Sequence, residues 1–232
     1  YSEINNVFGS FNTWKNTVKA GTGLLENHFT VDARLSQIKS DGYVDRASSN
    51  LQSFYISGAY INKKSSLRLN IFSGKEKTYQ SWYGVSEADL AAGKRRMNSA
   101  GTEKPGDPYE NETDNYTQTH YQLFFNQQIK PSLHFNTAIF LTTGKGYYEQ
   151  YKAGRDFAEF GLPYPVNGND TTFEADFVRQ LWLDNDFYGN TFSLQYNGPK
   201  TEATLGGAYT RYTGHHFGKI IWSSAVNISP RK

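Results

Sequence analysis

Histidine is the side chain in this sequence best suited to hold a metal ion, and it occurs five times. His215 and His216 are adjacent, so in a strand they point to opposite faces and cannot chelate one ion together. His28, His120 and His134 lie in separate segments of the chain. We therefore expect the histidines to act as ordinary polar residues, and the sequence predicts neither a metal site nor a cofactor.

Acidic residues form the second group with possible chemistry. Asp107, Glu110, Glu112 and Asp114 lie within one short stretch, and carboxylate oxygens are ligands that Ca²⁺ prefers. Their spacing is not that of an EF-hand loop, however. A solvated run of charge is the alternative, and it is the interpretation that we favour.

Sequence signatures of enzymes are missing. The chain has no Gly-x-Ser-x-Gly elbow, no Walker loop and no His-Glu-x-x-His helix. It has no cysteine, which excludes thiolate chemistry and disulfides. The formal net charge of +2 gives no electrostatic reason to expect nucleic acid as a partner. The sequence therefore indicates a protein that is not an enzyme and does not bind nucleic acid.

The elements that carry these residues are strands. Aromatic residues make up 16% of the 232 residues and methionine occurs once, a composition that favours sheet over helix. Eight segments alternate apolar and polar residues with period two. They are 14–20, 29–36, 53–60, 67–71, 117–125, 133–142, 191–197 and 203–210. We predict an all-β fold, an antiparallel up-and-down meander of about eight long strands.

The connections between these segments differ in length in a regular way. Short connections lie near 21–27, 62–66, 130–132 and 197–200. Long ones lie near 40–50, 80–115, 152–176 and 213–218. Because short and long connections alternate, a meander places all short turns at one end and all long loops at the other. This sorting is typical of outer-membrane barrels. Within 80–115, Ser86 and Asp89 resemble a capping box and predict a short helix.

The polar face of the predicted sheet gives a second indication. It carries Asp32, Arg34, Arg68, His120, Gln122, His134, Asn136 and Gln195. In a soluble barrel the opposite, apolar face would fill the interior, whereas in a membrane barrel it would face lipid. Periodicity does not choose between the two, but predicted strands of 12 to 18 residues exceed the roughly 9–11 that cross a bilayer.

Several runs of sequence resemble a known family. They are YQSWYGV at 79–85, NSAG at 98–101, YENETDNYTQTHYQL at 109–123, GKGYYEQYK at 144–152, RQLWLDNDFYGNTFSLQYN at 179–197 and TLGGAYTRYTGHHFGKIIW at 204–222. Together they resemble the barrel of TonB-dependent outer-membrane receptors, in particular a Bacteroidetes group similar to ferric-citrate-type siderophore receptors. The resemblance extends over nearly all of residues 1–232. It implies a barrel of about 22 strands around a plug, in the outer membrane, that imports a ligand bound from outside.

The chain departs from that family in one respect, because it lacks the plug domain and the energy-coupling box. We therefore expect a central fragment of a longer receptor, with long loops that are extracellular. Its partners would be an iron chelate or other small solute, outer-membrane lipid, and the TonB complex acting through the absent plug. Two unpaired sheet edges promote aggregation, so we expect the sheet to close into a small barrel or to pair its edges with another copy.

The resemblance also implies where a ligand would bind. A ferric siderophore or citrate-like ligand is anionic and needs arginine forks and aromatic walls. The candidates on the loop side are Trp82, Tyr83, Arg95, Arg96, Tyr147, Tyr148 and Arg155. The alternative for Arg95 and Arg96 is that they only offset the dipole at the end of the predicted helix.

Two other classes of protein fit part of the pattern. A small outer-membrane barrel enzyme acting on lipid would need a serine and a histidine at the rim of neighbouring strands, and the long loop 80–115 argues against it. A secreted β-sandwich that binds a ligand would bring its apolar faces together in a dry core. The position of the apolar faces therefore separates the sandwich from the membrane barrel.

Overall fold

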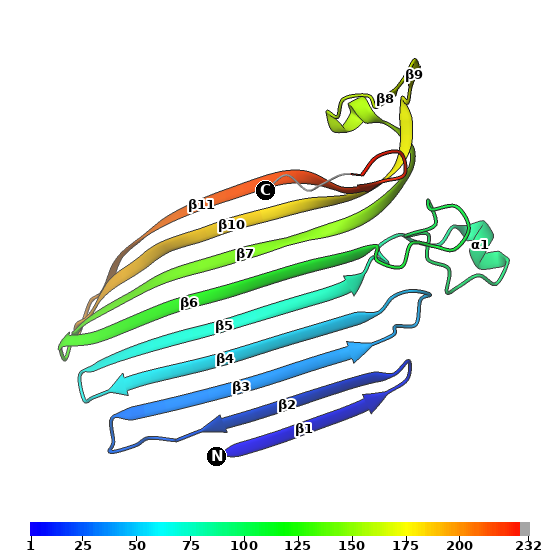
Figure 1. Ribbon diagram of the computed structural model, residues 1–232. Coiled ribbons are helices and arrows are strands. Elements are labelled where there is room, and N and C mark those ends of the chain that lie inside the picture. The colour runs from blue at the N-terminus through cyan, green and yellow to red at the C-terminus, as the bar shows by residue number, and fades with distance from the viewer. Residues whose placement is uncertain (228–232) are drawn as a thin grey trace.

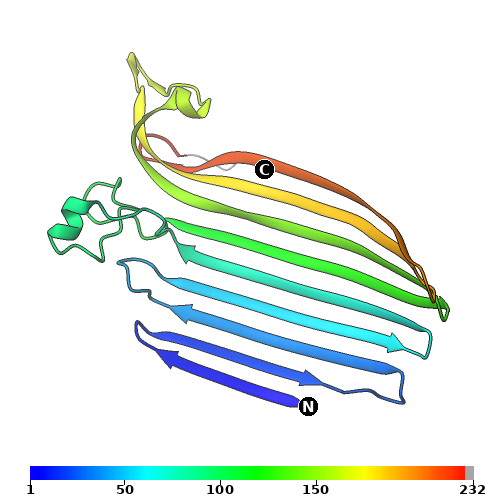
Figure 2. The same cartoon turned by 180° about the vertical axis from the view of Figure 1, so that it is seen from behind.

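The computed structural model describes residues 1–227 and consists mainly of one nine-stranded antiparallel sheet (Figure 1). Its strands are β1 (Ser2–Gly9), β2 (Thr13–Gly21), β3 (Phe29–Ser40), β4 (Ser49–Ile61), β5 (Ser65–Tyr79), β6 (Thr113–Lys130), β7 (Leu133–Asp156), β10 (Glu174–Asn197) and β11 (Glu202–Ser223). Their order in the sheet is their order in the chain, so the predicted all-β antiparallel meander is confirmed. The sheet is curved and open, with β1 and β11 at its edges (Figure 2). Of the two alternatives expected from the sequence, closure into a small barrel is therefore wrong, and pairing of the edges with another copy stays a prediction.

The two ends of the sheet carry different connections. One end, which we call the turn end, has the connections 22–28, 62–64, 131–132 and 198–201. The other, which we call the loop end, has 10–12, 41–48, 80–112 and 157–173. The connection 80–112 contains helix α1 (Glu87–Ala91), and 157–173 contains the 3₁₀ helix η1 (Phe157–Phe160) and a hairpin of β8 (Val166–Asn167) and β9 (Asp170–Thr171). The hairpin projects beyond the sheet (Figure 1).

The short helix predicted inside 80–112 is confirmed. Ser86 is the N-cap of α1, and its hydroxyl accepts a hydrogen bond from the backbone N–H of Asp89 at 3.1 Å. Such a cap satisfies one of the backbone donors that a helix start leaves free. With only five residues, α1 depends on this local chemistry rather than on a buried face.

Two features of the sheet differ from the sequence prediction. Strand β1 was not predicted, because only Ile4 and Phe8 are apolar on its outward face, between Ser2 and Asn6. The loop predicted at 213–218 is wrong, since these residues lie inside β11 and pair with 181–186 of β10. The run contains two glycines and two histidines, and Phe217 is its one large apolar residue, so it lacks the apolar alternation that would indicate a strand.

Strands β7 and β10 are also longer than predicted, at 24 residues each. Period-two alternation ends at Leu141 in β7, but the backbone pairing continues to Asp156. Beyond Leu141 the same face carries Thr143 and Lys145, so the hydrophobic signal disappears while the strand does not. The long connections are correspondingly shorter than expected.

One face of the sheet is apolar in its turn-end half. The register places Leu35 beside Phe54 and Ile71 beside Tyr121. The exposed members of this apolar band are Ile4, Val18, Val31, Leu35, Phe54, Ile56, Leu67, Leu69, Tyr121, Leu123, Ile139, Leu141, Tyr188, Phe192, Leu205 and Tyr209. In residues 1–227 no second layer of structure covers them.

The opposite face is polar, and all eight polar residues that the sequence assigns to one surface lie on it, as the strand register shows. The buried apolar cluster of the described chain is small and sits at the loop end, where Phe157, Ala175 and Phe177 pack together. The apolar band does not contribute to it, so the β-sandwich alternative is excluded. No helix within residues 1–227 has the length and apolar character needed to pass through a membrane.

Candidate ligand-binding site

A hollow of about 800 Å³ lies in the loop-end half of the polar face. We call it the loop-end cavity. Its lining comes from five adjacent strands, β5, β6, β7, β10 and β11. Nine of the lining residues lie on the polar face, and Tyr147, Trp182 and Phe217, whose positions alternate with them, complete the lining. The nine are Glu76, Asp114, Tyr116, Gly146, Tyr148, Leu181, Leu183, His216 and Gly218.

The floor of the loop-end cavity is the ring of Tyr116, which lies against Gly144 and Gly146 of β7. A Cβ atom on Gly144 or on Gly146 would collide with the Tyr116 side chain, so both glycines make room for that ring. The ring reaches from β6 across β7, and its hydroxyl donates a hydrogen bond of 2.8 Å to Asn185 Oδ1 on β10. Tyr116 is therefore fixed by three neighbouring strands. The Gly-Lys-Gly run in the sequence was the signal for this arrangement.

Two carboxylates supply the charge of the loop-end cavity. Burial raises the pKa of Glu76, and the nearby charge of Asp114 raises it further. Burial likewise raises the pKa of Asp114, although a backbone N–H at Asn115 partly opposes the shift. Neither side chain forms an ion pair within residues 1–227. Both lie nearer the loop end than the apolar band, which extends to Ile71 in β5 and to Tyr121 in β6.

Two of the predicted ligand residues meet at the loop-end cavity. Tyr148 lines it, and the ring of Trp82 lies edge-on to the Tyr148 ring at 5.8 Å. Trp82 is 57% exposed and Tyr83 49% exposed, so both are available to a molecule arriving from the loop side. The aromatic wall that the sequence predicts is thus partly assembled by the structure.

Tyr147 is directed elsewhere. As the neighbour of Tyr148 in a strand, it points to the opposite face of the sheet. There its ring packs against Trp182 at 4.6 Å, and Trp182 stacks on Phe217 at 5.9 Å. Tyr147 therefore belongs to an aromatic row on the band side of the sheet.

The predicted arginines do not converge on one site. Arg96 pairs with Asp45 at 3.2 Å and lies over the rings of Phe11 and Tyr43. Arg155 pairs with Glu103 at 2.9 Å. Arg95 is exposed on the connection 80–112. The alternative role at a helix end fails too, because the last turn of α1 contains no basic residue.

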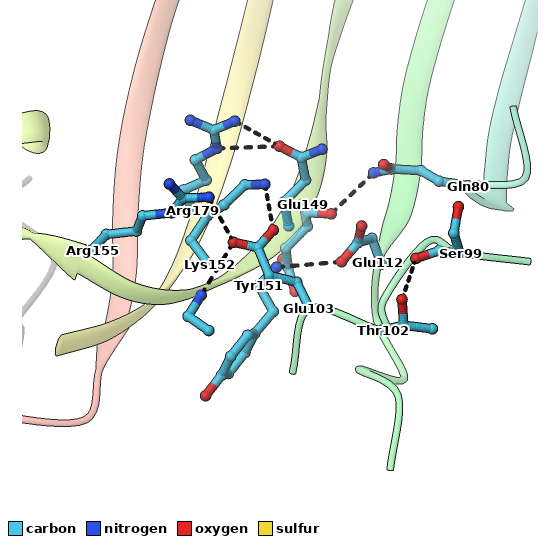
Figure 3. Close-up of polar contacts among 12 residues, drawn as sticks. Gln80, Ser99, Thr102, Glu103, Glu112, Glu149, Tyr151, Lys152, Arg155 and Arg179 are labelled. Atoms are coloured by element: carbon cyan, nitrogen blue, oxygen red, sulfur yellow. Dashed lines mark hydrogen bonds and ion pairs between the residues drawn. The ribbon is translucent and has the colours of Figure 1, made fainter. Parts of the chain in front are cut away.

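The connection 80–112 is fastened to the edge of β7, as Figure 3 shows. Beyond Tyr148, β7 has no β6 residue as partner, and side chains take its place. Gln80 Nε2 donates to the carbonyl of Glu149 at 3.0 Å, Glu112 Oε2 accepts from the N–H of Tyr151 at 3.4 Å, and Glu103 Oε1 accepts from the N–H of Ala153 at 3.3 Å. These contacts satisfy backbone groups that an unpaired strand edge would leave free.

Glu149 is the centre of a second set of contacts. It is 3% exposed, and its carboxylate accepts hydrogen bonds from Tyr109 at 2.6 Å, Asn111 at 2.6 Å and Gln180 at 2.7 Å. Burial and the bond to Glu149 raise the pKa of the Tyr109 hydroxyl well above its ordinary value. Asn98 donates to the carbonyl of Gln80 at 2.9 Å. The connection is therefore an ordered wall beside the loop-end cavity.

Glu103 joins this wall to two cations. Lys152 Nζ lies 2.7 Å from its carboxylate and Arg155 lies 2.9 Å away (Figure 3). Burial alone would raise the pKa of Glu103, but the hydrogen bonds from Lys152 and Arg155 outweigh burial and lower it. Arg155 thus fixes the loop, a role that the sequence did not indicate.

The acidic residues of the calcium hypothesis are separated. Glu112 faces the β7 edge, whereas Asp114 lines the loop-end cavity. Across residues 1–227, no three His, Cys, Asp or Glu side chains are grouped so as to hold a metal ion. The sequence analysis named Asp114 only as a possible calcium ligand, whereas the structure places it in the loop-end cavity. Glu76 lies between two lysines in the sequence and was not predicted to belong to any site.

A second cavity of about 630 Å³ lies nearer the N-terminal edge of the polar face. Its lining includes Asp32, Arg34, Tyr55, Phe72 and His120. The rings of Phe72 and His120 stack at 4.4 Å, and Thr142 hydrogen-bonds to His120 at 2.9 Å. This second cavity has charged side chains of both signs and lies on the face of the sheet opposite the apolar band.

Comparison with known proteins gives a match in fold. The sequence matches no protein-family model and no curated protein. The structure matches the ferric-catecholate import receptor Fiu from E. coli K12, in its closed form with a TM-score of 0.64 and in its open form with 0.65. It also matches BauA, the ferric preacinetobactin receptor from Acinetobacter baumannii, with a TM-score of 0.62.

The extent of these matches limits what they show. Identity is 13% in each case, and 92% to 94% of this chain is covered. The chain spans about a third of the length of the receptors, with 30% to 34% of each covered. The sheet therefore has the fold of part of a TonB-dependent receptor barrel. The comparisons give no support to the Bacteroidetes origin that the sequence suggested.

Proposed function

We propose that this chain forms part of the wall of an outer-membrane import receptor. The observation that carries the proposal is the apolar band, which is exposed on one face of a curved sheet with no covering layer in the described residues. Contiguous apolar surface of this extent is not left in contact with water by soluble proteins. Lipid satisfies it, and the polar face then lines the interior of the barrel.

The strand lengths agree with this placement. A 24-residue strand such as β7 extends about 80 Å at roughly 3.3 Å per residue. About 9–11 residues are enough to cross a bilayer, so the loop-end half of the long strands extends beyond the membrane. By the usual arrangement of such barrels the turn end is periplasmic and the long loops are extracellular.

The solute of the whole protein is, in this proposal, an iron chelate of the siderophore or citrate type or a related small molecule. The matched receptors are a ferric-catecholate import receptor and a ferric preacinetobactin receptor, which supports this choice. Trp82 and Tyr148 contact the solute at the loop-end cavity, and Tyr83 and Arg95 are exposed on the same connection as Trp82. Energy comes from the TonB complex through the plug domain of the whole receptor.

Deletion of the gene that encodes this chain tests the proposal. We expect growth on one of a panel of iron sources to fail, and uptake of radiolabelled iron from that source to fall at least tenfold. Plasmid-borne wild-type protein should restore uptake. Unchanged growth and uptake on every iron source would contradict the iron assignment, and recovery of the protein outside the outer-membrane fraction would contradict the location.

A further inference from the structure

We propose that the loop-end cavity binds an organic cation, so that the solute carries an ammonium or a similar positively charged group. This inference rests on the proposed function, because the ligand of the cavity is taken to be the imported solute. The charge of the binding site follows from the residues that line the cavity. It reverses the expectation from the sequence, in which arginine forks were to hold an anion.

The charge of the cavity lining is negative. Glu76 and Asp114 both line it, and no lysine or arginine does. The cations nearest along the strands are already engaged. Arg179 donates two hydrogen bonds to Gln150 Oε1, at 2.8 and 3.2 Å, and Lys152 pairs with Glu103. An anionic ligand in this cavity would therefore meet two carboxylates and no lysine or arginine among the lining residues.

The aromatic lining suits the same ligand. One face of the Tyr116 ring lies over Gly144 and Gly146, so the other face is presented to the cavity. Tyr148 stands beside it, and Trp82 extends the aromatic surface toward the loops. A cation held over a tyrosine or tryptophan face is attracted by the ring electrons, most strongly where water is excluded.

The two carboxylates lack a partner of opposite charge within the described chain. Burial raises the pKa of each, which shows that the surroundings disfavour the ionised forms. A positively charged ligand would remove this penalty as it binds. The lysines on either side of Glu76, Lys75 and Lys77, alternate with it along β5 and point to the opposite face.

The test compares two probes of equal shape and different charge. Choline and its neutral isostere 3,3-dimethyl-1-butanol are titrated into the full-length protein, purified in a non-ionic maltoside detergent, by isothermal titration calorimetry. We expect choline to bind at least tenfold more tightly. Equal affinity for the two probes, or tighter binding of citrate than of choline, would overturn the proposal.

Variants then locate the effect. The double substitution Glu76→Gln and Asp114→Asn should weaken choline binding about tenfold and leave the neutral probe unchanged. The matched control is Glu87→Gln with Asp107→Asn, which removes two exposed carboxylates of the connection 80–112 outside the cavity. Loss of choline binding in the control, or retention in the cavity variant, would refute the site. If the cavity variant does not assemble, the comparison of probes in the unmodified protein decides.

This experiment fails separately from the test of function. If deletion abolishes iron uptake but choline has no advantage, the receptor assignment stands and the cationic ligand is wrong. If choline is preferred but no iron source depends on the gene, the cavity assignment stands and the solute is a cation other than an iron chelate.

Discussion

The turn-end and loop-end halves of the long strands are stabilised in different ways. In the turn-end half, one face carries the apolar band and the other is polar, so stability depends on what lies outside the sheet. In the loop-end half the polar face continues, the opposite face carries only the short aromatic row of Tyr147, Trp182 and Phe217, and side-chain hydrogen bonds and ion pairs hold the structure together. Glu149 and Glu103 organise the connection 80–112 there, and Lys145 pairs with Asp184 at 2.6 Å across β7 and β10.

The difference shows that strand length and hydrophobic pattern are separate properties in this fold. In the proposed membrane placement, apolar residues are favoured only where the strand crosses the bilayer. Beyond that level the strands continue because backbone pairing and a few buried polar contacts replace the hydrophobic contribution. A ligand site can then form in the loop-end half, where the polar face remains open and the walls are rigid.

The largest expected effect tests the apolar band. Ile139→Arg places a charge on the band face of β7, where Ile139 is 58% exposed, and should destabilise the assembled protein by about 2–4 kcal/mol. Thr143→Arg is the control, since it changes the same face of the same strand four residues nearer the loop end, and we expect less than about 0.5 kcal/mol. Denaturant unfolding in lipid vesicles, followed by heat-modifiable migration, measures both. Equal losses would argue against a membrane boundary between these positions.

The second prediction concerns the polar network of the loop-end half. Glu149→Gln leaves too few acceptors for the three donors from Tyr109, Asn111 and Gln180, and hydrogen bonds to a charged group are worth about 1.5–3 kcal/mol. We expect faster proteolysis of the connection 80–112, with the sheet intact. Glu159→Gln, which removes an exposed carboxylate in η1, should leave the cleavage rate unchanged. Resistance equal to that of the wild type would show that the connection is held by other contacts.

The same contrast explains what the sequence could predict. In the turn-end half each strand alternates on its own, so local residues such as Val31 and Leu35 were enough to identify it. In the loop-end half the regular apolar alternation of β7 ends at Leu141, and the strand continues without a period-two signal. The roles of Arg96 and Arg155 were not predictable because their partners, Asp45 and Glu103, are distant in sequence and come close only in the fold.

The candidate site was partly predictable for a similar reason. Tyr148 and Trp82 were identified as aromatic residues on the loop side, and the structure does bring them together. Glu76 was not identified, because a lone acid between lysines looks like a solvated residue until the strand places it on the polar face. Tyr116 lies within a run that was noted, but its position over two glycines of another strand depends on register.

The third prediction tests the floor of the loop-end cavity. Gly144→Ala would place a Cβ atom against the Tyr116 hydroxyl and Asn185 Oδ1. The ring must move, at a cost of about 1–3 kcal/mol for overpacking, and choline affinity should fall with it. Gly74→Ala is the control, because a Cβ atom there has no neighbour within 4 Å. Unfolding measurements and calorimetry on the two variants separate them, and an unaffected Gly144→Ala protein would mean that the ring is not fixed.

The smallest expected effect is a dependence on pH at the connection 80–112. In the folded protein the hydrogen bonds from Lys152 and Arg155 lower the pKa of Glu103 below its ordinary value of about 4.5. Its stabilising contribution is therefore complete above about 4.5 and is lost as the pH falls through the folded value. We expect the connection to become more sensitive to an acid-active protease such as pepsin as the pH is lowered from 5 through this range.

Glu112 distinguishes this mechanism from a general loss of structure. Burial raises its pKa, so its protonation at low pH favours the folded form and acts in the opposite direction. In Glu103→Gln the connection should already be more sensitive at pH 5, and its sensitivity should stay level or decrease as the pH falls, while Glu87→Gln follows the wild type. A steep increase in protease sensitivity of Glu103→Gln as the pH falls would assign the effect to another carboxylate. The ion pairs of Glu103 with Lys152 and Arg155 would then not control the stability of the connection 80–112.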